Sequence, residues 1–449
     1  MPVKPIFIAV VLATASLLPA AADSVESPSL EREQNANLES FDHVWTTIHD
    51  SHWDPEMGGL DWEAVRDELR PKVEHETDLS AARAVMEEMI SRLGMSHFAI
   101  IPAEAYELLG GPEGQGMHDG WVGMDVRVIQ GRALVTSVAD GSPAAEAGVR
   151  PGWEVARIGE HEIASSLERV AAEFEETLYL DHVLASVVVG RLRGPVGDEI
   201  ALALRDGADR TVEVAMTFAE QRGEKVRIGY MPPMHVWIDT ARVDGTVGYI
   251  AFNMFIDPGR LMPVFNEAME SFMDSDGLVI DLRGNPGGLP AMAMGMAGWL
   301  ISEKSRRLGT MITRDTELKL IVFPRPRTYS GPVAVLVDGL SGSCSEILAG
   351  GLKDLGRARI FGSRTMGAAL PSMIEKLPNG DGFQYAFANY VSEGGEVLEG
   401  VGVVPHVEVT PSRVALIAGR DPVLDAAVAW IRREEASRSL TSDKQENTP

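Results

Sequence analysis

Hydrophobic side chains recur at helical spacing over residues 38–93. Two runs carry this spacing: Phe41, Val44, Trp45 and Ile48, then Ala82, Val85, Met86, Met89 and Ile90. Apolar residues three and four positions apart share one face of a helix, which packs on a core while the other face meets solvent. Asp78 stands where the N-cap of the second helix is expected. The pattern therefore predicts an N-terminal helical domain over residues 38–110.

The pattern changes to short β-strands after a glycine-rich stretch, residues 109–120, which is typical of a linker. Three stretches alternate between apolar and polar side chains or run continuously apolar: 123–129, 132–138 and 199–205. Both patterns are those of strands in a partly buried sheet. We predict a small β-rich module over residues 118–220.

Strands and helices alternate within residues 225–415. The predicted strands are 247–252, 277–282, 333–337 and 358–361, and the predicted helices are 259–273, 290–301 and 345–355. Such alternation favours a parallel or mixed sheet. A last helix is expected near 422–436, followed by a polar, disordered tail over 437–449. The predicted fold class is thus multidomain α/β: a helical domain, a β-rich module and an α/β core with a mixed sheet.

Composition excludes several classes of function. The chain has 449 residues, and 40 basic against 66 acidic side chains give a net charge of −26. So acidic a surface repels phosphate backbones, and we expect no nucleic-acid partner. The single cysteine, Cys344, excludes an internal disulfide and a cysteine-based zinc site. His49 and His52 could begin a metal site, but no third ligand is evident, so we expect neither a metal nor a cofactor.

The first 22 residues have the pattern of a secretory signal peptide. Lys4 is followed by an apolar run over 6–18 and then by three alanines before Asp23, which suits cleavage after Ala22. The apolar run is too short to cross a bilayer comfortably, and no later segment reaches about 18 apolar residues. We expect export to the periplasm or to the outside of the cell, without stable membrane insertion.

Ser343 is a candidate nucleophile. Residues 333–349 run from an apolar strand through a Gly/Ser turn into a helix, so Ser343 lies where backbone N–H groups have no partner within the helix. Such donors can stabilise an oxyanion in acyl transfer. Ser343 and Glu346 also match a capping box, which would explain the same residues without catalysis. Ser345 is a rival nucleophile.

Two other segments contain candidate functional residues, but neither of them indicates catalysis alone. Residues 277–288 form a strand that ends in Asp281 and Arg283 and then turns through paired glycines, which permit close backbone approach to a ligand. His97 follows the helical domain. A lone histidine is more often structural than catalytic.

Taken in chain order, these segments resemble the C-terminal-processing (tail-specific) serine peptidase family, which includes the tricorn core. The match covers about residues 38–410. The residues that carry it lie at 248–252, 281–288, 343–346, 356–362 and 399–405. None of the five segments is specific for this family alone, but the occurrence of all five in the same order along the chain is. The resemblance implies an α/β serine peptidase core.

The expected catalytic base differs from that of many members. Those members use a Ser–Lys dyad with the lysine in a T-x-G-K stretch, and here that position is Ala368. The tricorn-like branch instead uses a Ser-His pair and a glutamate. The matching positions of this chain are Ser96, His97 and Glu399.

The resemblance implies a role for each of these residues. Ser343 would attack the carbonyl carbon and His97 would accept its proton, while Ser96 and Glu399 orient the imidazole. The oxyanion donors would be backbone N–H groups of the loop and of the helix start: Gly287 or Gly288, and Cys344.

Residues 118–220 resemble a PDZ domain, which this family carries ahead of its catalytic core. The residues at the position of the PDZ carboxylate-binding loop are Trp121, Val122, Gly123 and Met124. PDZ domains bind a peptide C-terminus as an added strand. The alternative is a structural β-module without a free groove.

We therefore expect an exported serine endopeptidase that hydrolyses peptides or unfolded proteins through an acyl-enzyme. The first alternative is a non-catalytic PDZ-type peptide-binding protein with a degenerate peptidase core, for which Ala368 is the main support. The second is an esterase that uses the same site. The sequence carries no indication of an oligomeric state.

Overall fold

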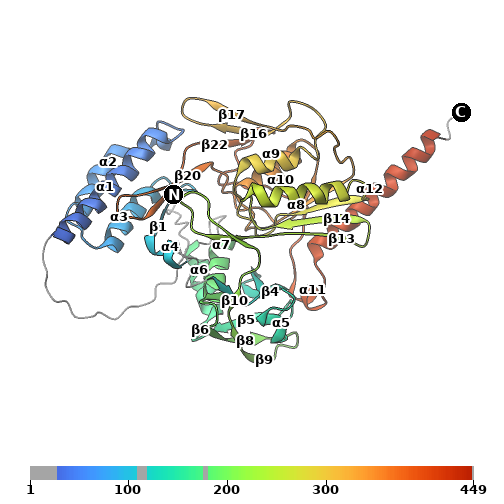
Figure 1. The fold of residues 1–449 in the computed structure, drawn as a ribbon, viewed down its shortest axis with the longest axis horizontal. Helices are drawn as coiled ribbons and strands as arrows, with labels where there is room; N and C mark the ends of the chain where they lie inside the picture. Colours follow the sequence, from blue (N-terminus) through green and yellow to red (C-terminus); the bar gives the residue numbers. More distant parts are fainter. Residues whose placement is uncertain (1–27, 109–118, 175–179, 447–449) are drawn as a thin grey trace.

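The computed structural model describes residues 28–108, 119–174 and 180–446. Three parts are visible in Figure 1: N-terminal helices, a β-rich module and a larger α/β core that contacts both. The predicted signal segment, residues 1–22, lies outside the described residues. Residues 109–118 of the predicted linker also lie outside them.

The N-terminal part is helical, as the periodicity predicts. Its helices are α1 (Pro28–Ser51), α2 (Trp62–Val73), α3 (Leu79–Ser91) and the short α4 (Ala103–Leu108). Trp45 and Trp62 bind each other's backbone carbonyls through their indole N–H groups, at 3.0 and 3.1 Å. The predicted cap is confirmed, because the Asp78 side chain accepts the Ser80 N–H. Helix α1 begins ten residues before the predicted start of the domain.

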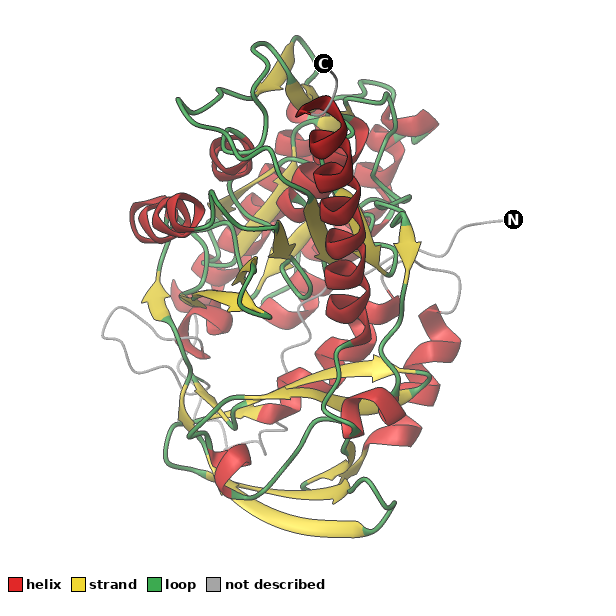
Figure 2. Ribbon diagram, turned by 90° about the vertical axis from the view of Figure 1, so that its right-hand side faces the viewer, coloured by secondary structure: helices red, strands yellow, loops and turns green. Residues whose placement is uncertain are grey.

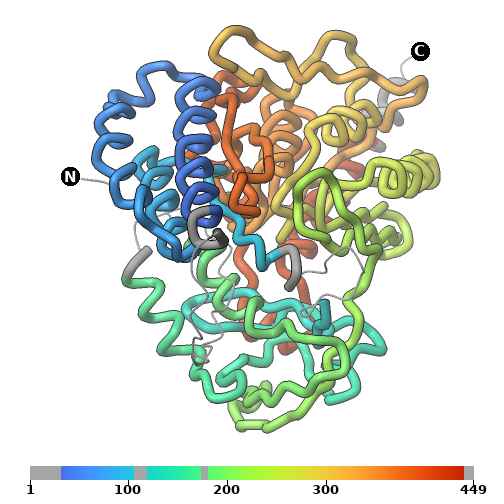
Figure 3. Tube along the Cα trace, turned by 60° about the vertical axis from the view of Figure 1, so that its left-hand side comes forward, coloured from blue at the N-terminus to red at the C-terminus, as the bar shows by residue number. Residues whose placement is uncertain are grey.

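A small sheet attaches these helices to the C-terminal half of the chain. Strand β1 (Ala99–Ile101) pairs antiparallel with β21 (Gly382–Ala386), which pairs with β20 (Ser372–Lys376). Figure 3 shows the blue helices beside this orange segment. Leu377 and Phe383 of the hairpin are buried in the same hydrophobic cluster as the helices. The link between α3 and β1, which contains Ser96 and His97, is therefore held against the core.

The β-rich module forms as predicted. Its main strands are β3 (Met124–Ile129), β4 (Arg132–Val138), β5 (Glu154–Ile158), β8 (Glu199–Arg205) and β9 (Thr211–Thr217), in that order across the sheet. Three short strands, β2 (Gly120–Trp121), β7 (Arg193–Gly194) and β10 (Ala219–Glu220), form a second sheet. Helices α5 (Pro143–Glu146), α6 (Ile163–Phe174) and α7 (Leu180–Val189) complete the module. Helix α7 packs against β3, the edge strand.

The α/β core is built on a mixed six-stranded sheet. Its strands are, in spatial order, β13 (Ile238–Val243), β14 (Val247–Phe252), β15 (Gly277–Asp281), β18 (Val333–Val337), β19 (Arg359–Gly362) and β23 (Val407–Glu408). Only the β13–β14 pair in this sheet is antiparallel, so the predicted mixed sheet is confirmed. A second sheet has the order β17 (Glu317–Ile321), β16 (Arg307–Ile312), β22 (Asn389–Ser392).

Helices cover both faces of the core sheet. Helices α8 (Pro258–Ser271), α9 (Pro290–Ala297) and α10 (Cys344–Asp354) bury one face, and α12 (Pro422–Glu446) crosses the other (Figure 2). The prediction of a disordered tail from residue 437 is wrong for residues 437–446, which continue α12. This stretch contains neither glycine nor proline to end the helix. None of the described helices, α12 included, is both long enough and apolar enough to cross a membrane.

Candidate active site

Two loops lie side by side at the carboxyl edge of the core sheet. Because β15 and β18 are parallel neighbours, the loops that follow them, residues 282–289 and 338–343, leave the sheet at the same edge. The Ser341 hydroxyl donates to the Leu282 carbonyl at 2.8 Å, and the Gly342 N–H donates to the Asn285 carbonyl at 3.1 Å. The predicted nucleophile loop and the predicted oxyanion loop are thus hydrogen-bonded to each other.

Ser343 precedes the first residue of α10 in an unusual backbone conformation. Its φ is 50° and its ψ is −113°, a region that residues other than glycine rarely occupy. Strained backbone conformations of this kind cluster at functional sites. Ser343 is partly exposed, whereas Ser345 is fully buried and donates its hydroxyl to the Asn285 carbonyl at 2.8 Å. Of the two rival serines, Ser343 is the one that solvent reaches.

The two loops also bring the predicted oxyanion donors together. A Cβ atom on Gly287 would lie 2.7 Å from the Cys344 amide nitrogen, so only glycine fits there. The Gly287 N–H donates to Asn285 Oδ1 at 2.9 Å and is therefore occupied. Within the described residues, the Gly288 and Cys344 N–H groups have no acceptor. Gly288 rather than Gly287 thus has the free donor. Burial raises the pKa of the Cys344 thiol, which disfavours its reactive thiolate.

Glu346 binds a second segment, residues 365–368, as well as the start of its own helix. Its buried carboxylate accepts four hydrogen bonds: from Ser343 N–H at 3.0 Å, Thr365 Oγ1 at 2.5 Å, Gly367 N–H at 2.7 Å and Ala368 N–H at 3.0 Å. Burial raises the pKa of Glu346 to about 7, and the four donors oppose that rise. The sequence indicated only the contact with Ser343, because the other donors follow twenty residues later.

The predicted base and its two orienting residues meet although they are about 300 positions apart. The Ser96 hydroxyl lies 2.6 Å from His97 Nδ1 and donates to Glu399 Oε2 at 2.8 Å. Glu399 also accepts the Ser96 N–H at 2.7 Å and the Ala369 N–H at 3.1 Å. Ser96 is fully buried. These contacts fix the imidazole through a buried hydroxyl and a carboxylate.

The same hydrogen bonds assign the tautomer of His97. Ser96 has a single hydroxyl proton, and it is donated to Glu399, so the Ser96 oxygen must accept a proton from His97 Nδ1. Nε2 is then unprotonated and can act as a base. Burial lowers the pKa of His97 to about 4, so the imidazole is neutral near pH 7. The φ of His97 is 60°, a second strained conformation at this site.

Ala368, at the position of the family's lysine, is an apolar contact. It is buried with Met366 and with Val183 of helix α7. Its carbonyl accepts the Ser343 N–H at 2.8 Å, and the next residue, Ala369, donates to Glu399. Ala368 and Ala369 therefore connect the nucleophile loop to the group around His97. Among the described residues, no hydrogen bond joins the Ser343 hydroxyl to the His97 imidazole.

The predicted carboxylate-binding loop precedes β3. Carbonyl groups of Val122 and Gly123 accept N–H groups from residues 144 and 139, both at 2.8 Å. The N–H groups of Val122 and Gly123 make no hydrogen bond to any described residue. The Trp121 indole donates to the Glu220 carbonyl at 2.9 Å, and Met124 is buried at the start of β3.

The two histidines considered as metal ligands have other contacts. His49 Nδ1 lies 2.8 Å from Asp50 Oδ1, while His52 is fully buried and stacks on Trp53. The residues that the structure describes contain no group of three or more His, Cys, Asp or Glu side chains that could hold a metal ion.

The sequence matches two known families of protein domains. Residues 246–409 match the peptidase family S41 domain, and residues 33–91 match the tricorn protease C1 domain. A carboxyl-terminal-processing peptidase of Arabidopsis thaliana is 24% identical over 395 residues, with 86% of this chain and 71% of that protein covered. A tricorn protease homolog of Streptomyces coelicolor is 27% identical, and this chain covers 32% of its length. A carboxyl-terminal-processing protease of Synechocystis is 26% identical, with 83% and 80% covered.

Solved structures share the fold. The photosystem II D1 C-terminal processing protease superposes with a TM-score of 0.55 at 22% identity, covering 87% of this chain and 98% of that one. Mature CPAF in complex with lactacystin superposes with a TM-score of 0.58 at 15% identity, covering 90% and 98%. The chain therefore carries a tricorn C1 domain followed by a peptidase family S41 domain, and it is a serine-type peptidase similar over most of its length to carboxyl-terminal-processing proteases.

Proposed function

We propose that this protein is an exported serine endopeptidase whose site uses Ser343, His97, Ser96 and Glu399 in place of a Ser–Lys dyad. The observation that carries the proposal is the hydrogen-bonded set of Ser96, His97 and Glu399, which leaves Nε2 of the imidazole free to accept a proton. A buried alanine at the lysine position is consistent with this choice of base.

The proposed reaction is acyl transfer to Ser343. Its hydroxyl oxygen attacks the carbonyl carbon of the scissile bond, and His97 Nε2 takes the hydroxyl proton. The N–H groups of Gly288 and Cys344 bind the oxyanion of the tetrahedral intermediate. His97 then gives the proton to the departing amine, and a water molecule activated by the same imidazole hydrolyses the acyl-enzyme.

The peptidase family S41 domain implies peptide or protein substrates. We propose that unfolded chains or peptides are cleaved, and that the β-rich module binds a peptide C-terminus at residues 121–124. The free N–H groups of Val122 and Gly123 support that role, because such donors bind a carboxylate. The signal-like pattern of residues 1–22 supports export to the periplasm or the outside of the cell.

A non-catalytic peptide-binding protein is the second candidate. The replacement of the family's lysine by Ala368, packed against Met366 and Val183, favours it. In this case the β-rich module would bind C-terminal peptides without turnover.

Labelling with a fluorophosphonate probe separates the two candidates. We expect the protein to be labelled, and we expect Ser343→Ala and His97→Ala to abolish labelling while circular dichroism shows a native fold. Ser345→Ala is the matched control, because Ser345 lies two residues away but is buried, and it should be labelled normally. Labelling that persists in Ser343→Ala or His97→Ala would refute the assigned residues. An unlabelled protein that binds C-terminal peptides would favour the second candidate, and turnover of small esters without peptide cleavage would indicate an esterase.

A further inference from the structure

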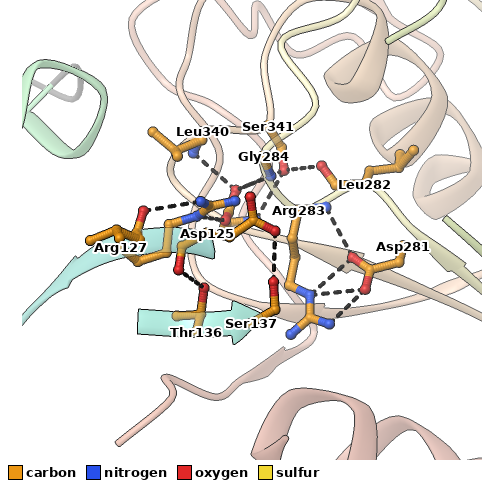
Figure 4. Close-up of polar contacts among 12 residues, drawn as sticks. Asp125, Arg127, Thr136, Ser137, Asp281, Leu282, Arg283, Gly284, Leu340 and Ser341 are labelled. Atoms are coloured by element: carbon orange, nitrogen blue, oxygen red, sulfur yellow. Dashed lines mark hydrogen bonds and ion pairs between the residues drawn. The ribbon is translucent and has the colours of Figure 1, made fainter. Parts of the chain in front are cut away.

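One arginine of the β-rich module reaches the loops of the candidate active site. Arg127 lies on β3, and its Nε donates to Asp338 Oδ2 of the core at 3.1 Å. Figure 4 shows the side chain extending from β3 toward Gly284 and the turn at Leu340. The guanidinium is packed so closely on Gly284 that a Cβ atom there would collide with it. The contact therefore depends on the shape of the loop as well as on charge.

Asp338 in turn holds both loops of the site. Its Oδ1 accepts the Gly284 N–H at 2.8 Å and the Leu340 N–H at 3.0 Å, and it lies 3.3 Å from the Ser341 hydroxyl. Gly284 begins the turn that leads to the free N–H of Gly288, and Leu340 and Ser341 precede the nucleophile. One carboxylate thus sets the position of one loop relative to the other.

The local structure of β3 fixes Arg127. Strands β3 and β4 change register between Asp125 and Val126. The Ser137 hydroxyl donates to Asp125 Oδ2 at 2.7 Å, and the Thr136 hydroxyl donates to the Asp125 carbonyl at 3.3 Å (Figure 4). Arg127 Nη1 also donates to the Val126 carbonyl at 3.2 Å. The arginine is therefore held from its own strand as it reaches the core.

A second acidic side chain, Asp181, lies close to the Arg127–Asp338 ion pair. Asp181, on helix α7 of the module, lies against Gly339, the residue next to Asp338. Partial burial and the nearby charge of Asp338 raise the pKa of the Asp181 carboxyl. The charges of Asp181 and Asp338 repel each other across the junction between module and core, and the Arg127 guanidinium bound to Asp338 places a positive charge at the same junction.

We propose that Arg127 is a positioning residue for peptide-bond hydrolysis: through Asp338 it holds the loop that carries the oxyanion donor Gly288 beside Ser343. The inference rests on the proposed function. If Arg127 acts in this way, the β-rich module helps to hold the two loops of the catalytic centre in place. Because a displacement of about 1 Å can reduce a rate by up to about 100-fold, losing this support should slow chemistry more than it weakens binding.

The test measures kinact and KI for a fluorophosphonate–rhodamine probe. Arg127→Ala and the volume-conserving Arg127→Met should each lower kinact by about tenfold, as expected for a misplaced oxyanion donor, while KI changes by less than about twofold. Arg127→Lys restores the charge and should recover part of the lost rate. The matched control is Arg413→Ala. Arg413 also joins core to module, donating to the Gly152 carbonyl at 3.0 Å and Asp209 Oδ1 at 2.6 Å, but contacts neither loop.

Two results would overturn the proposed role of Arg127. An unchanged kinact in the folded Arg127 variants would overturn the proposal, and so would an equal loss in Arg413→Ala, since any weakening of the docked module would then suffice. Thermal denaturation shows which variants are folded, and Arg127→Met provides the test if Arg127→Ala unfolds. If the unmodified protein is not labelled at all, the proposed function itself fails, and this inference fails with it.

Discussion

At the scale of single residues, the chemistry of the site depends on where two protons lie. The hydroxyl proton of Ser96 is bound to Glu399, which leaves His97 protonated on Nδ1 and free on Nε2. Burial keeps the imidazole neutral by lowering its pKa to about 4. A neutral base is therefore available over a wide pH range.

The pH profile of labelling should report this low pKa. Raising the pH deprotonates the imidazole, so the rate of fluorophosphonate labelling should rise through about pH 4 and then stay level past pH 6.5, the ordinary pKa of histidine. Glu346, whose pKa is about 7, accounts for any further change near neutrality, and Glu346→Gln should remove that change. A rise centred near pH 6.5 that persists in Glu346→Gln would contradict the environment assigned to His97.

Part of this site could be predicted from the sequence. Ser343, His97 and Glu399 each lie in a short segment with a recognisable order along the chain, and the structure brings His97 and Glu399 into one group with Ser96. The occupied N–H of Gly287 could not be predicted, because it depends on the rotamer of Asn285. The reach of Arg127 depends on how the module docks, which no local pattern encodes.

At the scale of elements, the start of helix α10 is fixed by Glu346. Glu346→Gln replaces one oxygen by an NH₂ group that faces two buried donors, either Ser343 and Ala368 or Thr365 and Gly367. Each unsatisfied donor costs about 1–3 kcal/mol, so we expect the free energy of unfolding to fall by about 2–6 kcal/mol.

Urea denaturation measures this loss. Ser345→Ala provides the control in the same helix, because it removes a single hydrogen bond to Asn285 and should cost about 1 kcal/mol. Equal stability of Glu346→Gln and the unmodified protein would show that the four contacts do not stabilise the fold.

A buried ion pair attaches the N-terminal helices to the β20–β21 hairpin. Arg83 of α3 donates to both carboxylate oxygens of the fully buried Asp381, at 3.2 and 2.8 Å. Arg83→Met leaves this carboxylate without a cation, so we expect a loss of about 3–5 kcal/mol in unfolding free energy.

The double variant Arg83→Met with Asp381→Asn removes the buried charge and should regain part of that stability. Chemical denaturation of the two single variants and the double variant forms a cycle that isolates the pair. If the two single losses simply add in the double variant, the ion pair does not couple the helices to the hairpin.

At the scale of the whole molecule, the periodicity predicted three parts and the mixed sheet, yet not how the parts join. Strands β20 and β21 were missed, because they are short and their partner β1 lies about 280 residues away. Long-range pairing of this kind is set by tertiary packing rather than by local propensity. That pairing brings His97 from the helical part to the core that contains Ser343.

The assembly of the site from separate parts predicts the behaviour of a truncated chain. A fragment of residues 225–449 keeps Ser343 and Glu399 but loses His97, so fluorophosphonate should not label it. It also loses the helices that bury Leu377 and Phe383, and it should bind a hydrophobic dye such as ANS more strongly than the full chain does. Full-length His97→Ala, which keeps that apolar surface covered, separates the two losses: it should be unlabelled without binding extra dye. A fragment labelled as fast as the full chain would show that the base lies within the S41 domain and that His97 is not required.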